Sequence, residues 1–415
     1  MGRGPGDAEG HGSRRLSEEH PRKPATRIVE AGRRKEWTGA VVNPPVWRGS
    51  THLYADSADL ARGRPNEDGH FYYGRRGSPT QWALAEALTE LEPGAAGTVL
   101  YPSGVAAIAG VLLAVLESGD TLLVTDNAYE PSRVMAQSLL APLGIETRFF
   151  DPLDIDGFAA LFDERTKAVL LESPGSLTME LCDVPALAAV ARAKGATSVL
   201  DNTWASSLGF PALERGCDIS LMSLTKHVGG HSDVMMGCAS AGDGFYRRLR
   251  AKSQALGQVV SPDDAALVLR GLRTLGVRLE RETESALTIA EWLAARPEVA
   301  QVLCPMLPGG QDHGLWQRDF TGGCGLFSFV LAGSDPEARA RLVDALELFG
   351  IGYSWGGYES LAIPFDPARA RSATSWPPGA WDPADRLGIR LSIGLEDPED
   401  LMRDLERGFA AMARP

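Results

Sequence analysis

A regular alternation of short apolar segments with amphipathic helical segments constrains the fold more than any other feature of this sequence. Between about residues 98 and 257, predicted strands such as TVLYPSG, TLLVTDNAY, KAVLLESPG, ATSVLDNTW and CDISLMSLTK are separated by helical stretches such as VAAIAGVLLAVLE. Short apolar strands alternating with helices are typical of a mostly parallel sheet that is covered on both faces. The sequence therefore predicts an α/β fold.

The pattern changes after about residue 265. One long helical stretch is followed there by shorter strands such as GLFSFVLAG and IRLSIG, and a chain of 415 residues exceeds one ordinary core. We therefore expect a second, smaller α/β domain, with the loop 363–386 as a surface excursion within it. The predicted divisions are a disordered tail (1–25), an N-terminal arm (26–75), a large domain (76–270) and a C-terminal small domain (271–415).

Composition excludes several classes of protein. The 41 basic and 54 acidic residues give a formal net charge of −13, which argues against a nucleic-acid partner because such binding neutralises phosphates with basic side chains. No apolar run approaches the roughly 20 residues that cross a bilayer, so no membrane association is expected. The five cysteines are scattered, without a Cys-x-x-Cys pair. We expect free thiols in a reducing cytoplasm and no metal site.

Polar residues follow several of the predicted strands. In open α/β sheets, ligands bind beyond the carboxyl ends of the strands, so these residues are the candidates for a site. They are Ser103-Gly104, Asp126 to Tyr129, Glu172-Ser173, Asp201-Asn202 and Ser223 to Lys226.

Lys226 stands out because it ends an apolar strand in the stretch SLTKHVGGHSD. A buried lysine amine becomes a nucleophile when its pKa is lowered, and its characteristic partner is a carbonyl cofactor such as pyridoxal 5'-phosphate (PLP). Ser223 and Thr225 offer hydroxyls suited to phosphate oxygens, and the following glycines let a ligand approach the backbone. A lysine that only extends its amine to solvent from a strand end would give the same pattern.

Asp201 ends the strand before the one that carries Lys226. PLP withdraws electrons effectively when its pyridine nitrogen stays protonated, and a carboxylate partner maintains that state. An aspartate that caps the next turn is the alternative interpretation. Two such residues at successive strand ends are better explained by one shared ligand.

Three further elements fit the same ligand. Ser103-Gly104-Val105 joins a strand directly to a helix, and helix N-termini bind anions such as phosphate. Tyr129 could stack on the pyridine ring, although a tyrosine in a loop is often simply packed. Arg390 lies in the apolar strand IRLSIG, where it could grip a substrate carboxylate through two parallel hydrogen bonds or could face water at a strand edge.

Together these residues resemble a known family. The segments YYGRRGSPT, YPSGVAA, ESPGSLTMELCDVPA, LDNTWAS, SLTKHVGGHSDVMMG, YSWGGYESL and IRLSIGLED are similar to those of the Cys/Met-metabolism PLP-dependent enzymes, and the resemblance runs from about residue 25 to near the end. It implies the type I (aspartate aminotransferase-like) fold, with a mostly parallel sheet in the large domain and a smaller C-terminal α/β domain. Within the family, the sequence most resembles the cystathionine β-lyases.

The resemblance assigns roles residue by residue. It implies that Lys226 holds PLP covalently and acts in catalysis, and that Asp201 pairs with the pyridine nitrogen. The residues implied to bind the phosphate are Gly104, Val105, Ser223 and Thr225, joined by Tyr73 and Arg75 of a neighbouring subunit. The residues implied to contact the substrate are Tyr129, Ser354, Trp355 and Arg390. The resemblance also implies that Tyr129 stacks on the cofactor ring and takes part in catalysis.

The implied reaction is cleavage of the Cβ–S bond of L-cystathionine, yielding homocysteine, pyruvate and ammonia, with cystine or S-alkylcysteines as further substrates. Trp355 would trim the pocket and favour Cβ over Cγ, although a merely packed indole would look the same. The alternatives are an enzyme that acts at Cγ and a PLP-binding regulatory protein without turnover. The expected assembly is a homo-oligomer, a dimer with shared active sites that pairs into a tetramer. His227 and His231 are interpreted as structural.

Overall fold

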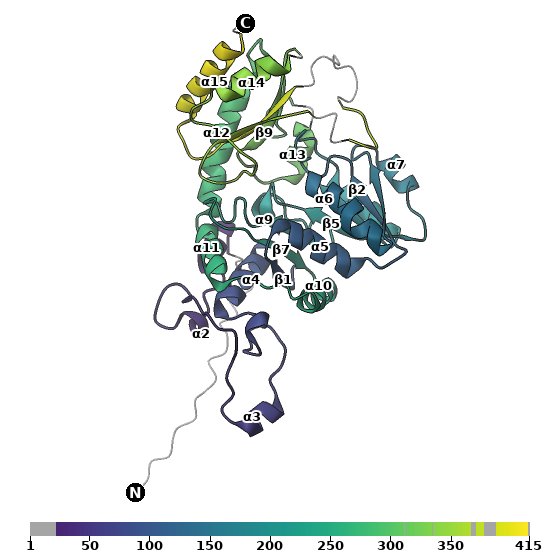
Figure 1. Cartoon of the computed structure of the whole chain (residues 1–415), viewed down its shortest axis with the longest axis vertical. Helices are drawn as coiled ribbons and strands as arrows, with labels where there is room; N and C mark the ends of the chain where they lie inside the picture. Colours follow the sequence, from purple (N-terminus) through teal and green to yellow (C-terminus); the bar gives the residue numbers. More distant parts are fainter. Residues whose placement is uncertain (1–21, 311, 334, 367–370, 377–386, 414–415) are drawn as a thin grey trace.

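The chain forms two β-sheets, each flanked by helices, which lie one above the other along the long axis of the molecule (Figure 1). The structure is a computed structural model. It describes residues 22–310, 312–333, 335–366, 371–376 and 387–413.

The larger sheet has seven strands and is mostly parallel. Its order is β1 (Gly97–Tyr101), β7 (Gly237–Ala241), β6 (Ile219–Ser223), β5 (Thr197–Asp201), β4 (Thr166–Glu172), β2 (Thr121–Thr125) and β3 (Glu146–Phe150). The strands from β6 to β3 are parallel to their neighbours, whereas β7 runs antiparallel to both β6 and β1. The predicted α/β fold with a mostly parallel sheet is confirmed.

Strand register brings the predicted site residues to one edge of this sheet. Glu172 pairs with Asp201 at the carboxyl ends of β4 and β5. Tyr101 of β1 and Ser223 of β6 both pair with Gly237, so the ends of β1 and β6 lie on either side of the start of β7. The peptide that follows β1 therefore begins its helix next to the peptide that leads to Lys226.

Alternate residues of these strands enter two separate apolar clusters. In β2, Leu123 packs into one cluster, whereas Leu122 and Val124 pack into the other. Successive side chains of a strand point to opposite faces, so both faces of the sheet are buried. This explains why the strands read as continuous apolar runs.

Helices cover both faces of the larger sheet. They are α4 (Pro79–Leu91), α5 (Gly104–Val115), α6 (Glu130–Met135) with its continuations η2 (Ala136–Leu140) and η3 (Ala141–Leu143), α7 (Ile155–Ala160), α8 (Val184–Ala193), α9 (Ser206–Gly209), α10 (Asp243–Ala255) and α11 (Pro262–Leu272). The long helix α12 (Leu275–Ala294) leads from this part of the chain to the second sheet (Figure 1).

The smaller sheet has five strands. Its order is β10 (Gly350–Ile351), β11 (Leu361–Phe365), β12 (Gly388–Ser392), β9 (Leu326–Leu331) and β8 (Val299–Leu303), and its other helices are α13 (His313–Asp319), α14 (Pro336–Asp344) and α15 (Pro398–Met412). The second sheet matches the expectation of a smaller α/β unit, while the domain boundaries themselves stay a prediction.

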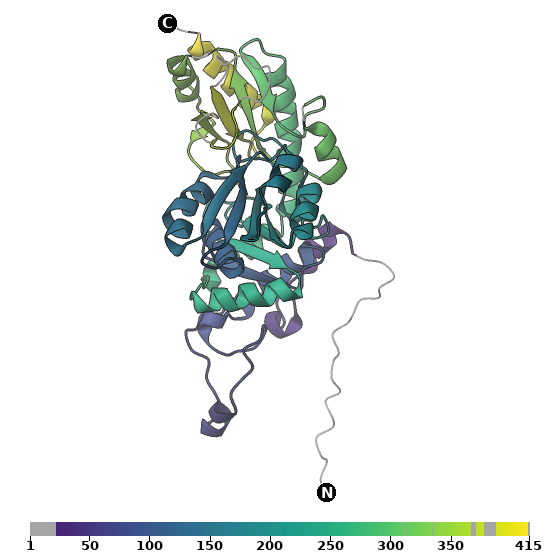
Figure 2. The same ribbon diagram turned by 90° about the vertical axis from the view of Figure 1, so that its right-hand side faces the viewer.

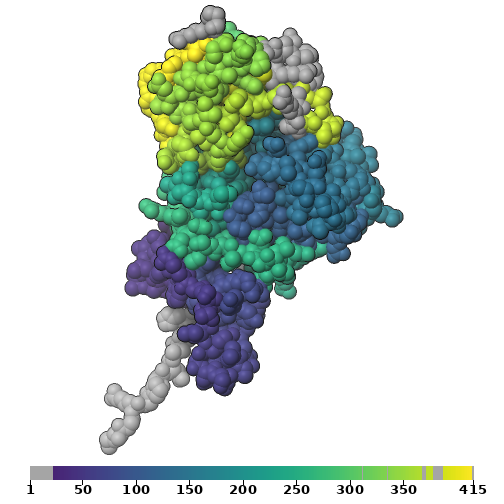
Figure 3. All heavy atoms as spheres, in the orientation of Figure 1, coloured from purple at the N-terminus to yellow at the C-terminus, as the bar shows by residue number. Residues whose placement is uncertain are grey.

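The N-terminal part begins with two helices that pack against α4, and then continues into a projecting loop. It contains α1 (Pro24–Glu30), α2 (Lys35–Thr38), α3 (Ser57–Arg62) and the short helix η1 (Gly74–Arg76). The loop that carries α3 projects from the body of the molecule in two perpendicular views (Figures 1 and 2). The space-filling view shows this purple segment at the end opposite the yellow C-terminal helix (Figure 3).

Two expectations differ from the structure in detail. Helix α1 begins at Pro24, inside the segment predicted as a disordered tail, and residues 1–21 of that tail lie outside the described residues. The predicted loop 363–386 starts inside a strand, because Ile363 and Phe365 are buried in β11. Residues 367–370 and 377–386 of that loop also lie outside the described residues.

Across the described part of the chain, every helix is too short or too polar to cross a membrane.

Candidate active site

Lys226 lies three residues beyond the end of β6 and lines two adjoining cavities. Its Nζ donates a hydrogen bond to Ser354 Oγ at 2.7 Å and lies 5.3 Å from the centre of the Trp355 ring. Ser354 and Trp355 belong to the loop between β10 and β11 of the smaller sheet. The amine therefore sits where the two halves of the chain meet.

The surroundings of Lys226 lower the pKa of its amine to about 8. Burial is the largest cause, and the positive charge of Arg390 adds to it, whereas the carboxylate of Asp201 acts in the opposite direction. A lysine with this pKa is partly neutral near pH 7–8, and only the neutral amine is a nucleophile or a base.

Asp201 ends β5 and is oriented by the next turn. Its Oδ1 accepts hydrogen bonds from the backbone N–H of Thr203, at 3.1 Å, and from the Thr203 hydroxyl. Thr203 Oγ1 in turn accepts a hydrogen bond from the backbone N–H of Ser223 at 2.9 Å. Thr203 thus connects the carboxylate to the strand that leads to Lys226.

Burial raises the pKa of Asp201, although the hydrogen bonds from Thr203 and the charge of Lys226 oppose the effect. Burial also raises the pKa of Glu172 well above its ordinary value, and the neighbouring charge of Asp201 raises it further. A nearby cationic ligand group would relieve this accumulation of negative charge. A protonated pyridine nitrogen is such a group.

Tyr129 lies in the loop after β2, and its backbone is hydrogen-bonded to Glu172. The backbone N–H of Tyr129 donates to Glu172 Oε2 at 2.6 Å, while its side chain is 39% exposed and lines both cavities. Burial is the main cause that raises the pKa of Tyr129. The ring is therefore free to contact a ligand, and its hydroxyl stays protonated at neutral pH.

The start of α5 forms an anion cradle beside β6. Ser103 caps the helix by accepting from the backbone N–H of Ala106 at 3.1 Å. A Cβ atom on Gly104 would lie only 2.7 Å from Ser223 Oγ, so this close approach requires glycine. The backbone N–H groups of Gly104 and Val105 are at the N-terminus of a twelve-residue helix, where an anion is stabilised.

Thr225 lines the same cavity, but its hydroxyl already has partners. Its Oγ1 donates to the backbone carbonyl of Met236 at 3.2 Å and accepts from the backbone N–H of Met236 at 3.0 Å. The hydroxyl would have to exchange its donor contact with Met236 for one with a phosphate oxygen.

Arg390 lies in β12 of the smaller sheet and reaches the cavity on the far side of Lys226. It is 7% exposed, and one guanidinium nitrogen donates to the backbone carbonyl of Ser354 at 3.1 Å. Burial lowers the pKa of Arg390 to about 10, so it stays charged at neutral pH. Within the described part of the chain, the buried Arg390 guanidinium has no carboxylate partner, which favours an anionic ligand.

Trp355 is half-buried and lines both cavities. Its ring lies 5.2 Å from that of His227, centre to centre. His227 is itself buried, with Nδ1 3.2 Å from Glu282 Oε2. The histidine thus supports the indole from behind and does not line either cavity.

The two cavities meet at Lys226. The inner cavity, of about 320 Å³, is lined among others by Gly104, Tyr129, Asp201, Ser223, Thr225 and Lys226. The outer cavity, of about 930 Å³, is lined among others by Tyr129, Lys226, Ser354, Trp355 and Arg390. The inner cavity has the size of a small-molecule site, and the outer one opens from it.

The residues of the inner cavity fit PLP. The close approach of Gly104 to Ser223 leaves room for a phosphate at the helix N-terminus, Asp201 offers a carboxylate to a pyridine nitrogen, and Lys226 offers an amine of lowered pKa to an aldehyde. The sequence prediction brought these groups together, and the structure has them around one cavity.

Comparison with known proteins agrees with this site. Residues 25–410 match the Cys/Met metabolism PLP-dependent enzyme family. The chain belongs to this family. PLP is therefore its cofactor, as the sequence predicted.

Named relatives of the chain include several cystathionine beta-lyases. The chain is 45% identical to the cystathionine beta-lyase of Escherichia coli over 93% of this chain and 98% of the relative. It is 44% identical to that of Salmonella typhimurium, again over 93% and 98%. Among solved structures, a cystathionine gamma synthase from Xanthomonas oryzae pv. oryzae superposes with a TM-score of 0.85 at 35% identity, over 95% of this chain and 99% of the other.

Tyr73 and Arg75 do not line either cavity of their own chain. Both lie at η1 in the N-terminal arm, where the Arg75 guanidinium is 5.3 Å from the centre of the Tyr73 ring. Arg75 instead lines a small separate cavity with Tyr246 and Arg250. The sequence predicted that these two residues serve a neighbouring subunit, and that prediction stays open.

Sequence reasoning missed two residues that support the site. Thr203 bridges Asp201 and Ser223, and Ser176 lines both cavities. The signal for Thr203 was its place in the motif LDNTWAS, directly after the aspartate. Glu172 was noted at a strand end, but its hydrogen bond to the backbone of Tyr129 depends on how β4 lies beside β2.

Proposed function

We propose that this chain is a PLP-dependent carbon–sulfur lyase that cleaves L-cystathionine, with uptake of one water molecule, to homocysteine, pyruvate and ammonia. The observation that carries the proposal is the outer cavity, where Lys226, Trp355 and Arg390 converge beside the cofactor pocket. The relatives named cystathionine beta-lyase support the same substrate, because they are 37–45% identical along most of the chain.

Arg390 would bind the substrate's α-carboxylate and orient the amino acid. Its guanidinium offers parallel N–H donors, and burial strengthens each charged hydrogen bond. Ser354 contacts both Arg390 and Lys226, through its backbone carbonyl and its hydroxyl respectively. The carboxylate grip and the reactive amine are therefore fixed relative to each other.

Lys226 would then remove the proton from Cα. When bound, PLP supplies an aldehyde that takes up the substrate amine and a ring that accepts the electrons of the Cα–H bond. The lowered pKa of the Lys226 amine suits it to take up that proton near neutral pH. Loss of the thiolate from Cβ and hydrolysis of the remaining fragment give pyruvate and ammonia.

Trp355 would limit what reaches the amine. The indole lies 5.3 Å from Lys226 Nζ, lines both cavities and is backed by His227, so it narrows the space around the substrate side chain. Tyr129 would stack on the cofactor ring at the other wall. Both residues shape the cavity around Cβ.

The identity of the keto acid tests this proposal. Purified protein with PLP and L-cystathionine should release pyruvate and homocysteine in equal amounts. Release of 2-oxobutanoate and cysteine would instead indicate an enzyme that acts at Cγ. No keto acid from cystathionine, cystine or S-methylcysteine, in a protein that binds PLP, would favour a regulatory role and reject the lyase.

We also propose that the active enzyme is a homo-oligomer with shared sites. Lys226 is the one cation among the described residues that line the inner cavity, although a phosphate dianion calls for more positive charge. The projecting arm carries Arg75 and the exposed Tyr73, which is 44% exposed. These features support an arm that completes a neighbouring subunit's phosphate site in a dimer. The pairing of such dimers into a tetramer is part of the proposal.

Mixing two inactive variants tests the shared site. Arg75→Ala and Lys226→Ala damage different sites if the arm reaches across, so hybrids of the two contain one intact site. Each hybrid dimer should have about half of the wild-type activity, so a 1:1 mixture formed by co-expression, in which about half of the dimers are hybrids, should recover up to about a quarter. Hybrids that remain inactive would contradict a shared site, and sedimentation would establish the assembly size.

We propose that the protein is located in the cytoplasm, because a reducing compartment is consistent with free thiols. The five cysteines are free and buried, and burial raises the pKa of Cys182 to about 12, so this thiol is unreactive.

A further inference from the structure

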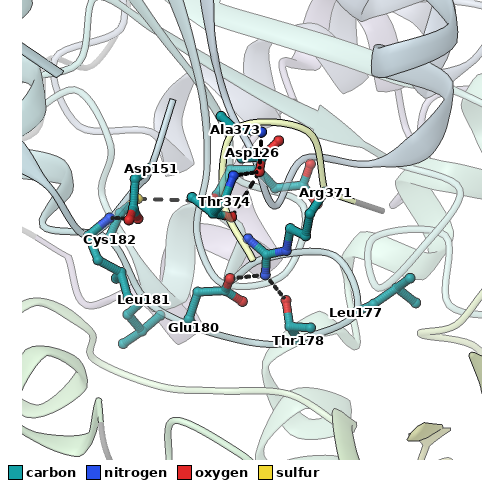
Figure 4. Close-up of polar contacts among 12 residues, drawn as sticks. Asp126, Asp151, Leu177, Thr178, Glu180, Leu181, Cys182, Arg371, Ala373 and Thr374 are labelled. Carbon is teal, nitrogen blue, oxygen red and sulfur yellow. Dashed lines mark hydrogen bonds and ion pairs between the residues drawn. The ribbon is translucent and has the colours of Figure 1, made fainter. Parts of the chain in front are cut away.

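The segment Arg371–Trp376, called here the clamped segment, joins the two halves of the chain beside the outer cavity. It follows β11 of the smaller sheet, yet residues 371–374 hydrogen-bond to loops that follow strands of the larger sheet. Figure 4 shows Ala373 and Thr374 against Asp126, and the Arg371 side chain directed to Thr178 and Glu180. Asp126 lies immediately beyond β2.

The Asp126 carboxylate accepts hydrogen bonds from the backbone of the clamped segment. Its oxygens accept hydrogen bonds from the backbone N–H groups of Ser372 at 3.0 Å, Ala373 at 3.0 Å and Thr374 at 2.8 Å. They also accept from the hydroxyls of Ser372 at 2.9 Å and Thr374 at 2.8 Å. One carboxylate thus binds three successive residues of the segment.

The charge of Asp126 is balanced locally. Asp126 is 0% exposed, and Arg133 Nη1 donates to its Oδ1 at 3.0 Å. Burial alone would raise the pKa of Asp126, but the hydrogen bonds from Ser372 and Thr374 outweigh it and leave the pKa lowered. The carboxylate is therefore ionised at neutral pH, and hydrogen bonds to an ionised group are stronger than neutral ones.

Arg371, the first residue of the segment, makes a second attachment. Its side chain is 5% exposed and donates to Thr178 Oγ1 at 2.7 Å and to Glu180. Thr178 and Glu180 follow β4, in the loop that also carries Ser176 of both cavities. The segment is therefore fixed to two different strand ends of the larger sheet.

Both attachments border the outer cavity, although Asp126 and residues 372–374 do not line it themselves. Arg133, Thr178 and Arg371 line that cavity, and so does Phe365, at the end of the strand that precedes the segment. Lys226 and Arg390 lie in the same cavity, so its wall beyond them is what the distal part of a substrate would meet.

We propose that Asp126 and Arg371 are positioning residues that hold the clamped segment against the larger sheet and thereby shape the outer wall of the substrate cavity. The inference rests on the proposed function only for the identity of the substrate. Asp126 and Arg371 bind residues other than Lys226, so their effect would be on substrates that extend beyond Cβ, not on the bond-breaking step itself.

A second buried carboxylate with similar partners serves as a control. It distinguishes an effect on the substrate cavity from a general effect on the stability of the fold. Asp404 in α15 is 3% exposed and accepts from the backbone N–H groups of Glu347, Leu348 and Phe349, with Arg407 beside it. It therefore has the same kind of partners as Asp126, but none of those partners lines the outer cavity, whereas Arg133 beside Asp126 does.

Hydrogen exchange of the PLP-bound protein tests the clamp without activity. Asp126→Asn keeps the size of the side chain but replaces an accepting oxygen with an NH₂ group that faces N–H donors. The amides of Ser372, Ala373 and Thr374 should then exchange about 10- to 100-fold faster than in the wild type. Asp404→Asn should leave their exchange unchanged. Wild-type exchange of the segment in Asp126→Asn would overturn the proposal.

Substrate size tests the effect on the cavity. In Asp126→Asn the KM for L-cystathionine should rise about 10-fold with kcat within about twofold, while the KM for S-methylcysteine changes less than about threefold. Equal increases for both substrates, or the same pattern in Asp404→Asn, would overturn the proposal. If the wild-type protein releases no pyruvate, the proposed function fails, and the exchange experiment still decides on the clamp.

A second variant covers the case in which Asp126→Asn does not fold. The double variant Ser372→Ala/Thr374→Val removes both hydroxyl donors from a partly exposed segment and keeps the carboxylate. It should show a smaller acceleration of exchange, about 3- to 10-fold, with the same selective rise of KM for cystathionine. Unchanged exchange together with unchanged KM would overturn the proposal.

Discussion

Replacement of Arg390 by alanine should lower kcat/KM for L-cystathionine by about 10²- to 10⁴-fold. Two hydrogen bonds between a buried guanidinium and a carboxylate contribute about 1.5–3 kcal/mol each, or about 3–6 kcal/mol together. Each 1.4 kcal/mol or so corresponds to a factor of ten in rate. Arg390 is 7% exposed, so water does not replace the lost contacts well.

The assay is release of pyruvate, measured for the wild type, for Arg390→Ala and for Arg390→Lys. Lysine keeps the charge but offers no parallel pair of donors, so it should recover only part of the loss. Arg318→Ala is the control, because Arg318 pairs with Asp183 and Asp319 and does not line either cavity. It should retain wild-type kcat/KM.

A substrate without the α-carboxylate completes the test. An S-substituted cysteamine cannot use the guanidinium, so its binding to the PLP-loaded protein should be affected less than about threefold by Arg390→Ala. If the variant loses affinity equally for cysteamine and cysteine derivatives, Arg390 acts on the structure of the site and the assigned role is wrong.

Three further predictions follow from the local geometry. Gly104→Ala should weaken PLP binding at least about 10-fold in an absorbance titration, because its Cβ would lie 2.7 Å from Ser223 Oγ, while Gly244→Ala, in open space, should not. Because burial lowers the pKa of Lys226 from 10.5 to about 8, the folded PLP-free protein binds fewer protons than the unfolded chain between those values. Its free energy of unfolding should therefore gain a contribution that rises from about pH 8 to 10.5, measurable by urea titration and absent in Lys226→Met; an identical slope in both proteins would contradict the assigned pKa. Trp355→Leu should lower the rate of pyruvate release from cystathionine about 10-fold and raise the share of 2-oxobutanoate; an unchanged product ratio would show that the indole does not select Cβ.

The larger sheet could be predicted because its signals are local. Strands buried on both faces read as continuous apolar runs, and the polar residues that follow them mark one edge of a parallel sheet. Asp201 and Lys226 could therefore be assigned to one ligand before any coordinates. Their shared cavity depends only on the order of adjacent strands, β5 and β6.

Contacts between distant segments could not be predicted in this way. The hydrogen bond of Lys226 with Ser354 joins residues 128 positions apart, and those of Asp126 with Thr374 span 248 positions. Nothing in the sequence near Asp126 indicates that its carboxylate accepts hydrogen bonds from a segment that follows a strand of the smaller sheet. The loop 363–386 reads as a surface excursion because its proline and small residues hide the anchored stretch within it.

The sequence also could not predict whether a side chain binds the backbone or a ligand. Thr225 was predicted to bind phosphate from its place beside Lys226, and the structure adds that its hydroxyl is already bonded to the backbone of Met236. Such a choice between a backbone partner and a ligand depends on the return path of the chain through β7, which the motif itself does not contain.

The covalent attachment of PLP to Lys226 tests the central claim most directly. The protein should be incubated with PLP, reduced with borohydride, digested and examined by mass spectrometry. The account predicts a visible absorption band that disappears on reduction and a pyridoxyl phosphate group on the peptide that contains Lys226. A colourless protein, or a label on another lysine with Lys226 unmodified, would contradict it.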